Sequence, residues 1–357
     1  MDRSAPPHLS SEMRAAVLYG KQDVRVEELP CAALQPGEVR IAIQAALTCG
    51  TDLKVFKRGY HAKMIVPPSL FGHELAGLIE EIHPATHGWR IGERVVVANS
   101  APCDECFYCH HGQENLCDDL VFLNGAYAQS IVVPARLVEK NMLRIGPRTS
   151  FPDAALTEPF ACVAQGVADL ALHGNERVLV IGSGPIGLMF VALLKHIGCD
   201  VTLAGRGEER LALAHKLEAR TIEILPAQDV VSRIRGERQT FDVAVEAVGK
   251  TETWEAAIQT VRKGGLVNFF GGCPSGTLVR LDTGLVHYSN LRVVASFHHT
   301  PRTIRRSLSY IQEGVISAAD FVDGSCGLEE LPRLLGSMAQ ANRAVKTLVK
   351  TQGQVSD

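Results

Sequence analysis

The chain has 357 residues, a formal net charge of -3 and no long blocks of Lys or Arg. That length suits two domains, each large enough for a sizeable apolar core. The weak charge and scattered cations predict no nucleic-acid or membrane partner, so the expected ligand is a small molecule. The N-terminus has no signal-peptide pattern, so we expect the protein to lie in the cytoplasm. Because a reducing compartment does not maintain disulfides, the ten cysteines are expected to act as thiolates.

Short apolar or alternating runs between Met13 and about Arg144 predict a β-rich domain at residues 13–155. The runs are MRAAVLY, DVRVEEL, EVRIAIQAAL, AGLIEEI, RVVVANS and AQSIVVPA. A frayed tail is expected before them, at residues 1–12, because Pro and Ser are frequent there.

From Arg177 the pattern changes, and apolar strands of four to six residues alternate with helix-length segments. The strand candidates are RVLVIG, DVTLAG, FDVAVEAVG and GLVNFFGG, with LRVVAS as a further one. This alternation predicts a parallel α/β domain, assigned to residues 156–296. Residues 297–357 contain two amphipathic helical segments and a terminal strand, AVKTLVKT, and are predicted to return to the first domain.

Four cysteines in the first domain, at about residues 100–120, have the spacing C-x2-C-x2-C-x7-C. A tight loop with this spacing can present four thiolates to one ion with no open position, which predicts a structural zinc site. Incidental or disulfide-bonded cysteines are the alternative, and a reducing compartment argues against it. Acidic residues around the cysteines argue against a nucleic-acid-binding zinc module. The predicted ligands are Cys103, Cys106, Cys109 and Cys117.

A glycine-rich loop, GSGPIG, joins the strand VLVI to the helical segment LMFVALLKHIG. In that context the first glycine allows a tight turn, the second lets a pyrophosphate approach the backbone, and the third permits close packing of helix on strand. The helix N-terminus attracts the phosphates. An ordinary glycine-rich connection is the alternative. The residues predicted to bind a dinucleotide here are Gly182, Gly184, Pro185, Ile186 and Gly187.

The end of the next strand, in DVTLAGRGEER, is where NAD-preferring folds usually carry an acidic residue for the ribose 2'-hydroxyl. This chain has Gly205 there, followed by Arg206. The missing carboxylate removes repulsion toward a 2'-phosphate, and a guanidinium can clamp that phosphate bidentately. NADP(H) is therefore predicted over NAD(H), which stays possible, with Arg210 as a second cation. The alternative is that Arg206 is a solvated loop residue.

Three further segments carry side chains that zinc accepts as ligands. Cys49 lies in TCGTD, His73 and Glu74 lie in FGHE, and Glu158 lies in TEPF. Each segment taken alone also has a plain structural explanation: a buried cysteine, a turn, and an acidic residue favoured at a helix N-terminus. The residues by themselves leave both explanations open.

In chain order, Cys-Gly-Thr-Asp, Gly-His-Glu, the four cysteines, Glu-Pro and the glycine loop resemble the zinc-containing medium-chain dehydrogenases. Within that family the chain is most similar to the sorbitol and polyol dehydrogenases and the related threonine dehydrogenases. The resemblance covers nearly the whole chain from Met13. It implies an α/β fold with a Rossmann dinucleotide-binding domain and a β-rich GroES-like catalytic domain, two zinc ions per chain, and a homodimer or homotetramer.

The resemblance also implies roles for the isolated residues. Cys49 and His73 match catalytic zinc ligands, and either Glu74 or Glu158 supplies the carboxylate, a choice that the family pattern leaves open. Thr51 matches the hydroxyl that passes the substrate proton outward, with an ordinary turn residue as the alternative. Zinc in such a site lowers the pKa of a bound alcohol and prepares hydride transfer to the nicotinamide.

Two departures from animal sorbitol dehydrogenases bear on the substrate. The stretch CDDLVFLNGAY, with Phe122 inside it, looks shorter than its counterpart, and His298 and His299 stand where those enzymes tend to have an Arg. Neutral imidazoles both donate and accept hydrogen bonds to hydroxyls. Phe122, His298 and His299 are therefore candidate substrate residues, with simple packing at a boundary as the alternative for the histidines.

The resulting prediction is a zinc-dependent oxidoreductase that transfers hydride between a secondary alcohol, polyol or cyclitol-like substrate and NAD(P). A threonine-type amino-alcohol dehydrogenase and a biosynthetic carbonyl reductase are alternatives. From another class, a non-catalytic cofactor-binding member of the family is a third. That third alternative predicts loss of the catalytic ligands, whereas all four candidate ligands are present in the sequence.

Overall fold

The computed structural model describes residues 11–61, 63–226, 228–236, 240–340 and 345–352. Its contacts divide the chain into two units. Unit 1 comprises Met1–Cys103, Asp119–Leu156 and Gly324–Asp357, and unit 2 comprises Asp104–Asp118 and Thr157–Asp323. The predicted tail lies outside the described residues except for Ser11 and Glu12, and Glu12 opens the first strand.

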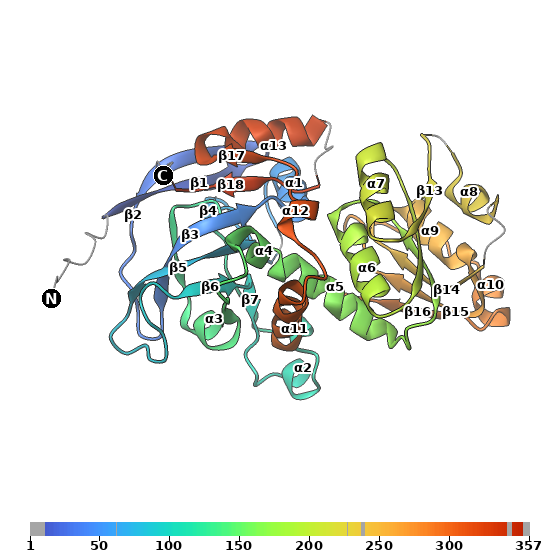
Figure 1. The fold of residues 1–357 in the computed structure, drawn as a ribbon, viewed down its shortest axis with the longest axis horizontal. Helices are drawn as coiled ribbons and strands as arrows, with labels where there is room; N and C mark the ends of the chain where they lie inside the picture. Colours follow the sequence, from blue (N-terminus) through green and yellow to red (C-terminus); the bar gives the residue numbers. More distant parts are fainter. Residues whose placement is uncertain (1–10, 62, 227, 237–239, 341–344, 353–357) are drawn as a thin grey trace. The chain divides into compact units, whose positions relative to one another are not determined.

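Unit 1 is rich in short β-strands (Figure 1). Its strands are β1 Glu12–Gly20, β2 Asp23–Pro30, β3 Val39–Leu47, β4 Ser69–Leu70, β5 Leu75–Ile82, β6 Arg94–Val97, β7 Ser100–Ala101, β8 Val121–Phe122, β9 Ser130–Val133, β10 Met142–Arg144, β17 Ser325–Gly327 and β18 Leu348–Lys350. Its helices are α1 Gly50–Arg58, α3 Ala135–Lys140, α4 Phe151–Ala155, the 3-10 turn η2 Leu328–Glu330, and α13 Leu331–Gln340.

Strand β3 is the centre of unit 1. Among the described residues it pairs with β5, β9 and β18 in a seven-stranded sheet of order β10-β6-β5-β3-β18-β17. Val39, Ile41 and Ile43 on this strand are fully buried. A central strand flanked on both sides buries nearly all its side chains, which is why EVRIAIQAAL is an almost continuous apolar run. The last strand, β18, pairs with β3, so the C-terminal segment belongs to the same unit as the N-terminal strands.

Unit 2 alternates strands and helices. Its strands are β11 Arg177–Ile181, β12 Asp200–Gly205, β13 Arg220–Glu223, β14 Phe241–Glu246, β15 Val261–Phe269 and β16 Arg292–Ala295. Its helices are α2 Phe107–His110, the 3-10 turn η1 Glu114–Leu116, α5 Thr157–Leu170, α6 Pro185–His196, α7 Glu208–Lys216, α8 Val230–Gly236, α9 Thr251–Thr260, α10 Thr283–Tyr288, α11 Pro301–Gln312 and α12 Ala318–Phe321.

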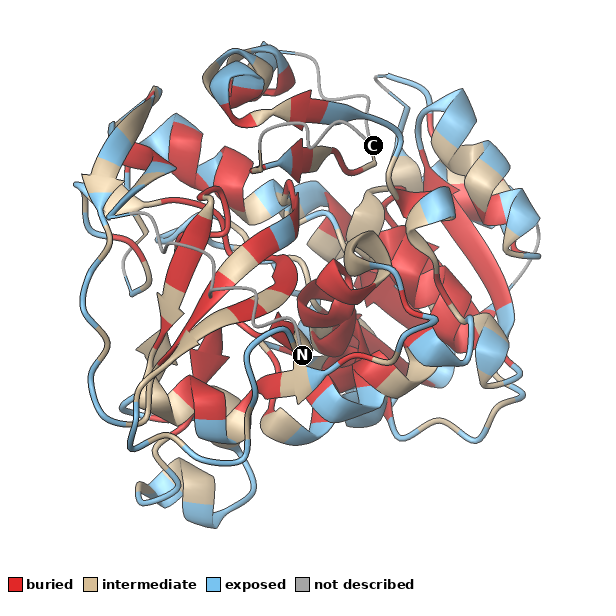
Figure 2. Cartoon of the chain, turned by 60° about the vertical axis from the view of Figure 1, so that its left-hand side comes forward, coloured by how far each residue is buried: buried red, intermediate tan, exposed pale blue. Residues whose placement is uncertain are grey.

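The strands of unit 2 form one parallel sheet, six strands wide among the described residues, in the order β13-β12-β11-β14-β15-β16. In sequence order this is 3-2-1-4-5-6, the order of a Rossmann fold. Figure 2 shows buried strands and helix faces in red inside this unit. Strand β13 was not among the predicted strands, because its segment is short and only Ile222 in it is buried. None of the helices in the described residues is long and apolar enough to cross a membrane.

The boundaries of the two units differ from the predicted ranges in two places. Return to unit 1 starts at Gly324 and not at residue 297, because α11 packs on α5 and its Ser307 Oγ donates to the Thr157 carbonyl at 2.8 Å. The segment Asp104–Asp118 belongs to unit 2, where Asn115 Nδ2 donates to the Phe297 carbonyl at 2.9 Å. Both contacts join segments far apart in sequence, so no local pattern signals them.

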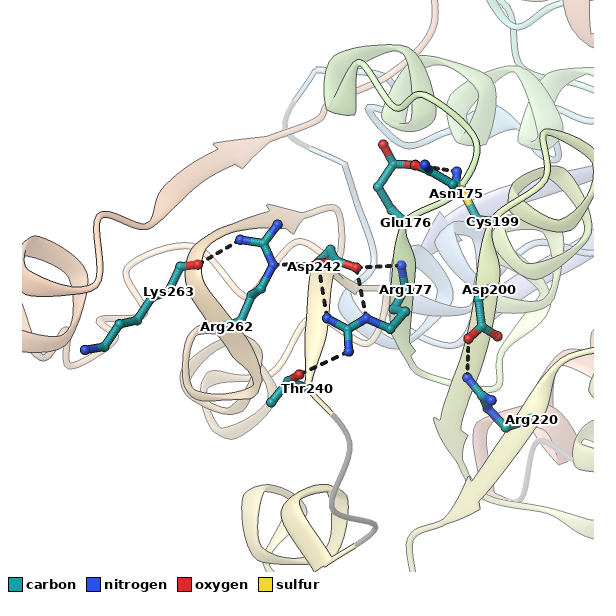
Figure 3. Close-up of polar contacts among 10 residues, drawn as sticks. All are labelled: Asn175, Glu176, Arg177, Cys199, Asp200, Arg220, Thr240, Asp242, Arg262 and Lys263. Atoms are coloured by element: carbon teal, nitrogen blue, oxygen red, sulfur yellow. Dashed lines mark hydrogen bonds and ion pairs between the residues drawn. The ribbon is translucent and has the colours of Figure 1, made fainter.

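The half-buried carboxylate of Asp242 links three strands at the edge where β11, β14 and β15 begin (Figure 3). Asp242 accepts hydrogen bonds from the Arg177 backbone N–H at 2.9 Å and from the Arg177 guanidinium at 3.1 and 3.3 Å, and Arg262 Nε donates at 2.5 Å. Its side chain is 17% exposed. The Arg177 guanidinium is the main reason that the pKa of Asp242 lies well below its usual range.

We expect Asp242→Asn to lower the free energy of unfolding at pH 7 by about 1.5–3 kcal/mol, since charged hydrogen bonds contribute that much. A depressed pKa stabilises the fold above the unfolded value of about 3.9, and this stability is lost as the pH falls toward the folded value. The variant should therefore lose less stability than the parent between about pH 5 and 2. Urea unfolding across that range tests this. Asp200→Asn, at the exposed Arg220 pair near the same edge, is the matched control and should change stability by under about 0.5 kcal/mol.

Candidate active site and metal centres

In unit 1, the Cys49 thiol, the His73 imidazole and the Glu74 carboxylate lie within 4.8 Å of one another. Cys49 is the N-cap of α1, and its Sγ accepts from the Thr51 N–H at 3.4 Å. His73 and Glu74 immediately precede β5; the exposed fraction is 4% for His73 and 0% for Glu74. One soft sulfur, one imidazole nitrogen and one carboxylate oxygen make a three-ligand set that fits zinc and leaves a fourth position open.

The His73 ring is oriented by the carboxylate of Asp52, which was not among the predicted site residues. His73 Nδ1 lies 2.9 Å from Asp52 Oδ1, so Nε2 is the nitrogen available to a metal. The other Asp52 oxygen accepts from the hydroxyl of Tyr127, which is fully buried. Burial lowers the pKa of His73, but the charges of Asp52 and Cys49 outweigh it and hold the pKa well above its usual value.

Glu74 is also held by a group that the sequence did not reveal. Lys346 Nζ lies 2.5 and 2.7 Å from the two carboxylate oxygens and donates to the Thr48 carbonyl at 3.1 Å. Lys346 is 2% exposed, so both charges of this pair are buried. It lies in the segment before β18, and only the pairing of β18 with β3 brings it to Glu74.

The four cysteines of the zinc lobe, residues 103–117, come together as the spacing predicts. Their sulfurs lie within 4.8 Å of one another, and the sulfurs of Cys106 and Cys109 are 3.6 Å apart. Two thiolates on one tetrahedral zinc lie about 3.8 Å apart, given Zn–S distances of about 2.3 Å. All four thiols are free of disulfides. The lobe therefore has the geometry and the chemistry of a closed zinc site.

The glycine loop of unit 2 turns where β11 meets α6. Gly182 has a φ of +120°, which disfavours any side chain. A Cβ on Gly187 would lie 1.8 Å from the Gly182 carbonyl oxygen, so this position needs a glycine for close packing. Pro185 occupies the first turn of α6, with Gly184 as N-cap. The first N–H groups of α6 are thus presented at the turn.

A cavity of about 380 Å³ opens at the carboxyl ends of β11, β12 and β14. Ligands of open α/β sheets bind at such carboxyl ends. The Ser183 hydroxyl links the glycine loop to the segment after β12, because it accepts from the Arg206 N–H at 2.9 Å and donates to the Arg206 carbonyl at 2.6 Å. The lining includes five of the predicted cofactor residues and others that were not predicted: Gly182, Gly184, Gly205, Arg206 and Arg210, with Ser183, Val248, Lys250, Glu252 and Thr253. We call this the cofactor pocket.

The remaining predicted site residues lie in both units. Phe122 lies on the two-residue strand β8 of unit 1 and is half-buried. Glu158 lies in the first turn of α5 in unit 2, and His299 Nε2 is 3.7 Å from its Oε1. His298 also groups with Glu158, within 4.8 Å, together with Cys162. In unit 2 the structure thus gathers Glu158 and both histidines.

Family models match the chain in two stretches. Residues 35–142 match the alcohol dehydrogenase GroES-like domain, and residues 185–313 match the zinc-binding dehydrogenase domain.

Full-length relatives agree with these matches. A sorbitol dehydrogenase of Bacillus subtilis is 28% identical over 347 residues, which are 94% of this chain and 97% of that protein. A D-altritol 5-dehydrogenase of Agrobacterium fabrum is 32% identical over 84% of this chain and 88% of its own length. Among solved structures, a zinc-binding dehydrogenase of Sinorhizobium meliloti has a TM-score of 0.86 and 28% identity, covering 96% of this chain and 100% of that one.

The predicted family and the predicted fold class, a GroES-like domain with a Rossmann domain, are confirmed by these matches. The chain belongs to the zinc-containing medium-chain dehydrogenase family, in its sorbitol and polyol dehydrogenase branch, and is a zinc-dependent alcohol or polyol dehydrogenase.

Proposed function

We propose that the chain is an NADP(H)-preferring dehydrogenase that interconverts a polyol or cyclitol-like secondary alcohol and its ketone. The observation that carries the cofactor preference is the charge of the cofactor pocket. Gly205 stands where an acidic residue would repel a 2'-phosphate, and Arg206 and Arg210 line the same cavity. Lys250 and Glu252 line it too, but Lys250 Nζ lies 3.8 Å from the Glu252 carboxylate, so the charges of these two residues offset each other. The related structure from S. meliloti is described as bound to NADP.

Each zinc proposal rests on the chemistry and the grouping of its donor atoms. Cys49, His73 and Glu74 would hold the catalytic ion, which when bound lowers the pKa of a coordinated hydroxyl. Asp52 fixes the tautomer of His73, and Lys346 compensates the buried charge of Glu74. The cysteines of the zinc lobe would hold the second ion.

The proton and the cofactor have their own groups in this proposal. Thr51, in the first turn of α1, would accept the substrate proton on its hydroxyl and pass it outward. The N–H groups at the start of α6 would bind the pyrophosphate, as helix N-termini bind anions. The predicted amino-alcohol and carbonyl substrates remain alternatives, which substrate profiling with alcohols, amino alcohols and ketones separates.

The cofactor proposal is tested by titrating the zinc-replete protein with NADPH and with NADH and following nicotinamide fluorescence. We expect NADPH to bind at least about tenfold more tightly, a difference of about 1.4 kcal/mol. Arg206→Ala should abolish that preference, whereas Arg148→Ala, at an exposed position of unit 1, should leave it intact. Equal or tighter binding of NADH by the parent protein would make the NADP(H) assignment wrong.

We also propose a homodimer formed through β16. This strand is an edge of the parallel sheet, and edge strands present unpaired backbone groups that can pair with a second chain. Leu278, Leu281, Tyr288 and Phe297, which are 50–91% exposed, flank it in sequence. Such apolar exposure around an edge favours an isologous contact with a second copy. Sedimentation equilibrium of the parent and of Val293→Arg tests this, because the variant should sediment as a monomer.

The cellular setting that we propose is the cytoplasm. The support is chemical: the zinc lobe needs four thiolates, and all ten cysteines are free of disulfides. A reducing compartment keeps thiols in that state. Fractionation of cells that express the tagged protein tests the proposal, which enrichment in an oxidising compartment would contradict.

A further inference from the structure

A fully buried asparagine interrupts the apolar core of unit 2. Asn268 lies on β15, in register with Val245 on β14 and Val294 on β16, and it is 0% exposed. Strands that are covered on both faces read as nearly continuous apolar runs, and a buried amide costs free energy unless it is hydrogen-bonded. The hydrogen bonds of Asn268 must therefore offset a cost that an apolar residue would avoid.

The side-chain amide of Asn268 connects β15 to two other segments. Its Nδ2 donates to the Gly166 carbonyl on α5 and to Ser296 Oγ, both at 3.0 Å. Ser296 directly follows β16 and is 7% exposed, and its hydroxyl donates to Asp169 Oδ2 on α5 at 2.6 Å. Asn268, Ser296 and Asp169 thus form a directed series of hydrogen bonds from the buried strand to the exposed side of α5. We call this series the Asn268 network.

The network is not the most stable arrangement for this part of the core. Oδ1 of Asn268 is buried and has no hydrogen-bond partner among the described residues, and an unsatisfied buried acceptor is destabilising. A leucine of similar volume would leave no such oxygen. Local departures from good packing chemistry are typical of functional sites, which suggests a role beyond stability for Asn268.

The network lies at the edge of the sheet where a dinucleotide would extend beyond the cofactor pocket. A Rossmann sheet has two mononucleotide-binding halves, and ligands lie along the carboxyl ends of their strands. The first half, with β11, β12 and β13, contributes Gly205 and Arg206 to the pocket. Because Arg206 is proposed to meet the 2'-phosphate of the adenosine half, the second half, with β14, β15 and β16, is left for the nicotinamide. Residues 296–300 follow the carboxyl end of β16 and belong to this second half.

The 296–300 segment is held from several sides. Besides the network, Asn115 Nδ2 of the zinc lobe donates to the Phe297 carbonyl at 2.9 Å, and Thr300 caps α11. Between these anchors His298 has a φ of +64°, a left-handed conformation that is uncommon for residues other than glycine. A segment with such a conformation depends on its surroundings to keep it.

We propose that Asn268 is a positioning residue for the nicotinamide half of the cofactor, because through Ser296 it fixes the 296–300 segment before the cofactor binds. The inference rests on the proposed binding of NADP(H) by unit 2. A segment that is already ordered loses less conformational entropy when the ligand arrives, so its order contributes to affinity. The adenosine half depends on the glycine loop and Arg206, on the first half of the sheet. Loss of the network therefore weakens binding of the whole cofactor more than binding of its adenosine half.

Calorimetric titration of the full-length protein with two ligands tests this. NADPH carries both halves, whereas adenosine 2',5'-bisphosphate carries the adenosine half with its 2'-phosphate and has no nicotinamide. We expect Asn268→Leu to raise the Kd for NADPH at least about tenfold, the effect of one lost buried hydrogen bond, and to change the Kd for adenosine 2',5'-bisphosphate by less than about twofold. Leucine removes the amide at a similar volume, so packing of the strand is retained.

Two further variants separate this effect from a change in folding. Ser296→Ala breaks the same network one step later, so it should show the same pattern, with a loss of at least about threefold for NADPH. Thr260→Val removes another buried hydroxyl of unit 2, just before the opposite end of β15. It is the matched control and should bind both ligands like the parent protein.

The outcomes distinguish this inference from the proposed function. Unchanged binding of NADPH by Asn268→Leu, or equal weakening of both ligands, would overturn the inference and leave the proposed function standing. If the parent protein bound NADH in place of NADPH, the cofactor preference would be wrong, and the same comparison with NADH and adenosine 5'-diphosphate would decide the inference. A parent protein that bound neither dinucleotide would overturn both.

Discussion

Replacement of Cys49 by Ser is expected to remove one zinc ion per chain and to lower kcat/KM for alcohol oxidation by at least about 1,000-fold, because Lewis-acid stabilisation contributes several kcal/mol. Serine suits this test. Cys49 is the N-cap of α1, and serine is a preferred N-cap residue, so the helix keeps its cap while the soft ligand is lost. Activity with a polyol series, zinc content and circular dichroism check the three parts of the expectation.

The matched control for Cys49→Ser is Cys31→Ser, a half-buried cysteine outside the metal-ligand groups of the described residues. It should retain both the zinc content and the activity of the parent protein. If Cys49→Ser also retained them, Cys49 would not be a ligand, and the proposal for the catalytic ion would be wrong.

Replacement of Lys346 by Met is expected to destabilise the protein by about 3–5 kcal/mol. The reason is that removal of one partner of a buried ion pair leaves the other charge uncompensated. The Glu74 carboxylate is fully buried, and Lys346 Nζ contacts both of its oxygens. Burial already raises the pKa of Glu74, and loss of the ammonium group would raise it further. Urea unfolding in a Cys49→Ser background measures the loss, because that variant should carry no zinc ion beside Glu74 to compensate the charge.

A double variant separates this charge effect from simple loss of packing. Glu74→Gln with Lys346→Met removes both charges, so it should recover most of the stability lost in Lys346→Met. Lys350→Met, on the exposed end of β18, is the matched control and should change stability by under about 0.5 kcal/mol. If the single and double variants were equally unstable, packing of the lysine stem and not the ion pair would explain the loss.

Local sequence patterns predicted those parts of the protein whose geometry depends on near neighbours. The loop GSGPIG is such a case, because its turn and the close packing of Gly187 on Gly182 involve residues five apart. The spacing of the zinc-lobe cysteines is another, since all four sulfurs come from one short segment. The alternation of strands and helices likewise predicted the parallel sheet. Ordered motifs along the chain predicted the family, which the family matches confirmed.

The tertiary structure alone decided how distant residues are paired around the functional groups. Sequence motifs predicted His73 and Glu74 as ligands. They did not predict that Asp52 contacts His73 and accepts a hydrogen bond from Tyr127. Nor did they predict that Glu74 pairs with Lys346, which lies 272 positions later in the chain. The sequence named Glu158 and His298 without showing that Cys162 lies with them. Periodicity and spacing report which residues share a face or a turn, whereas the partner of a buried charge is set by strand pairing and helix packing. Those pairings depend on the whole chain, because each must bury apolar surface and satisfy polar groups together with all the others.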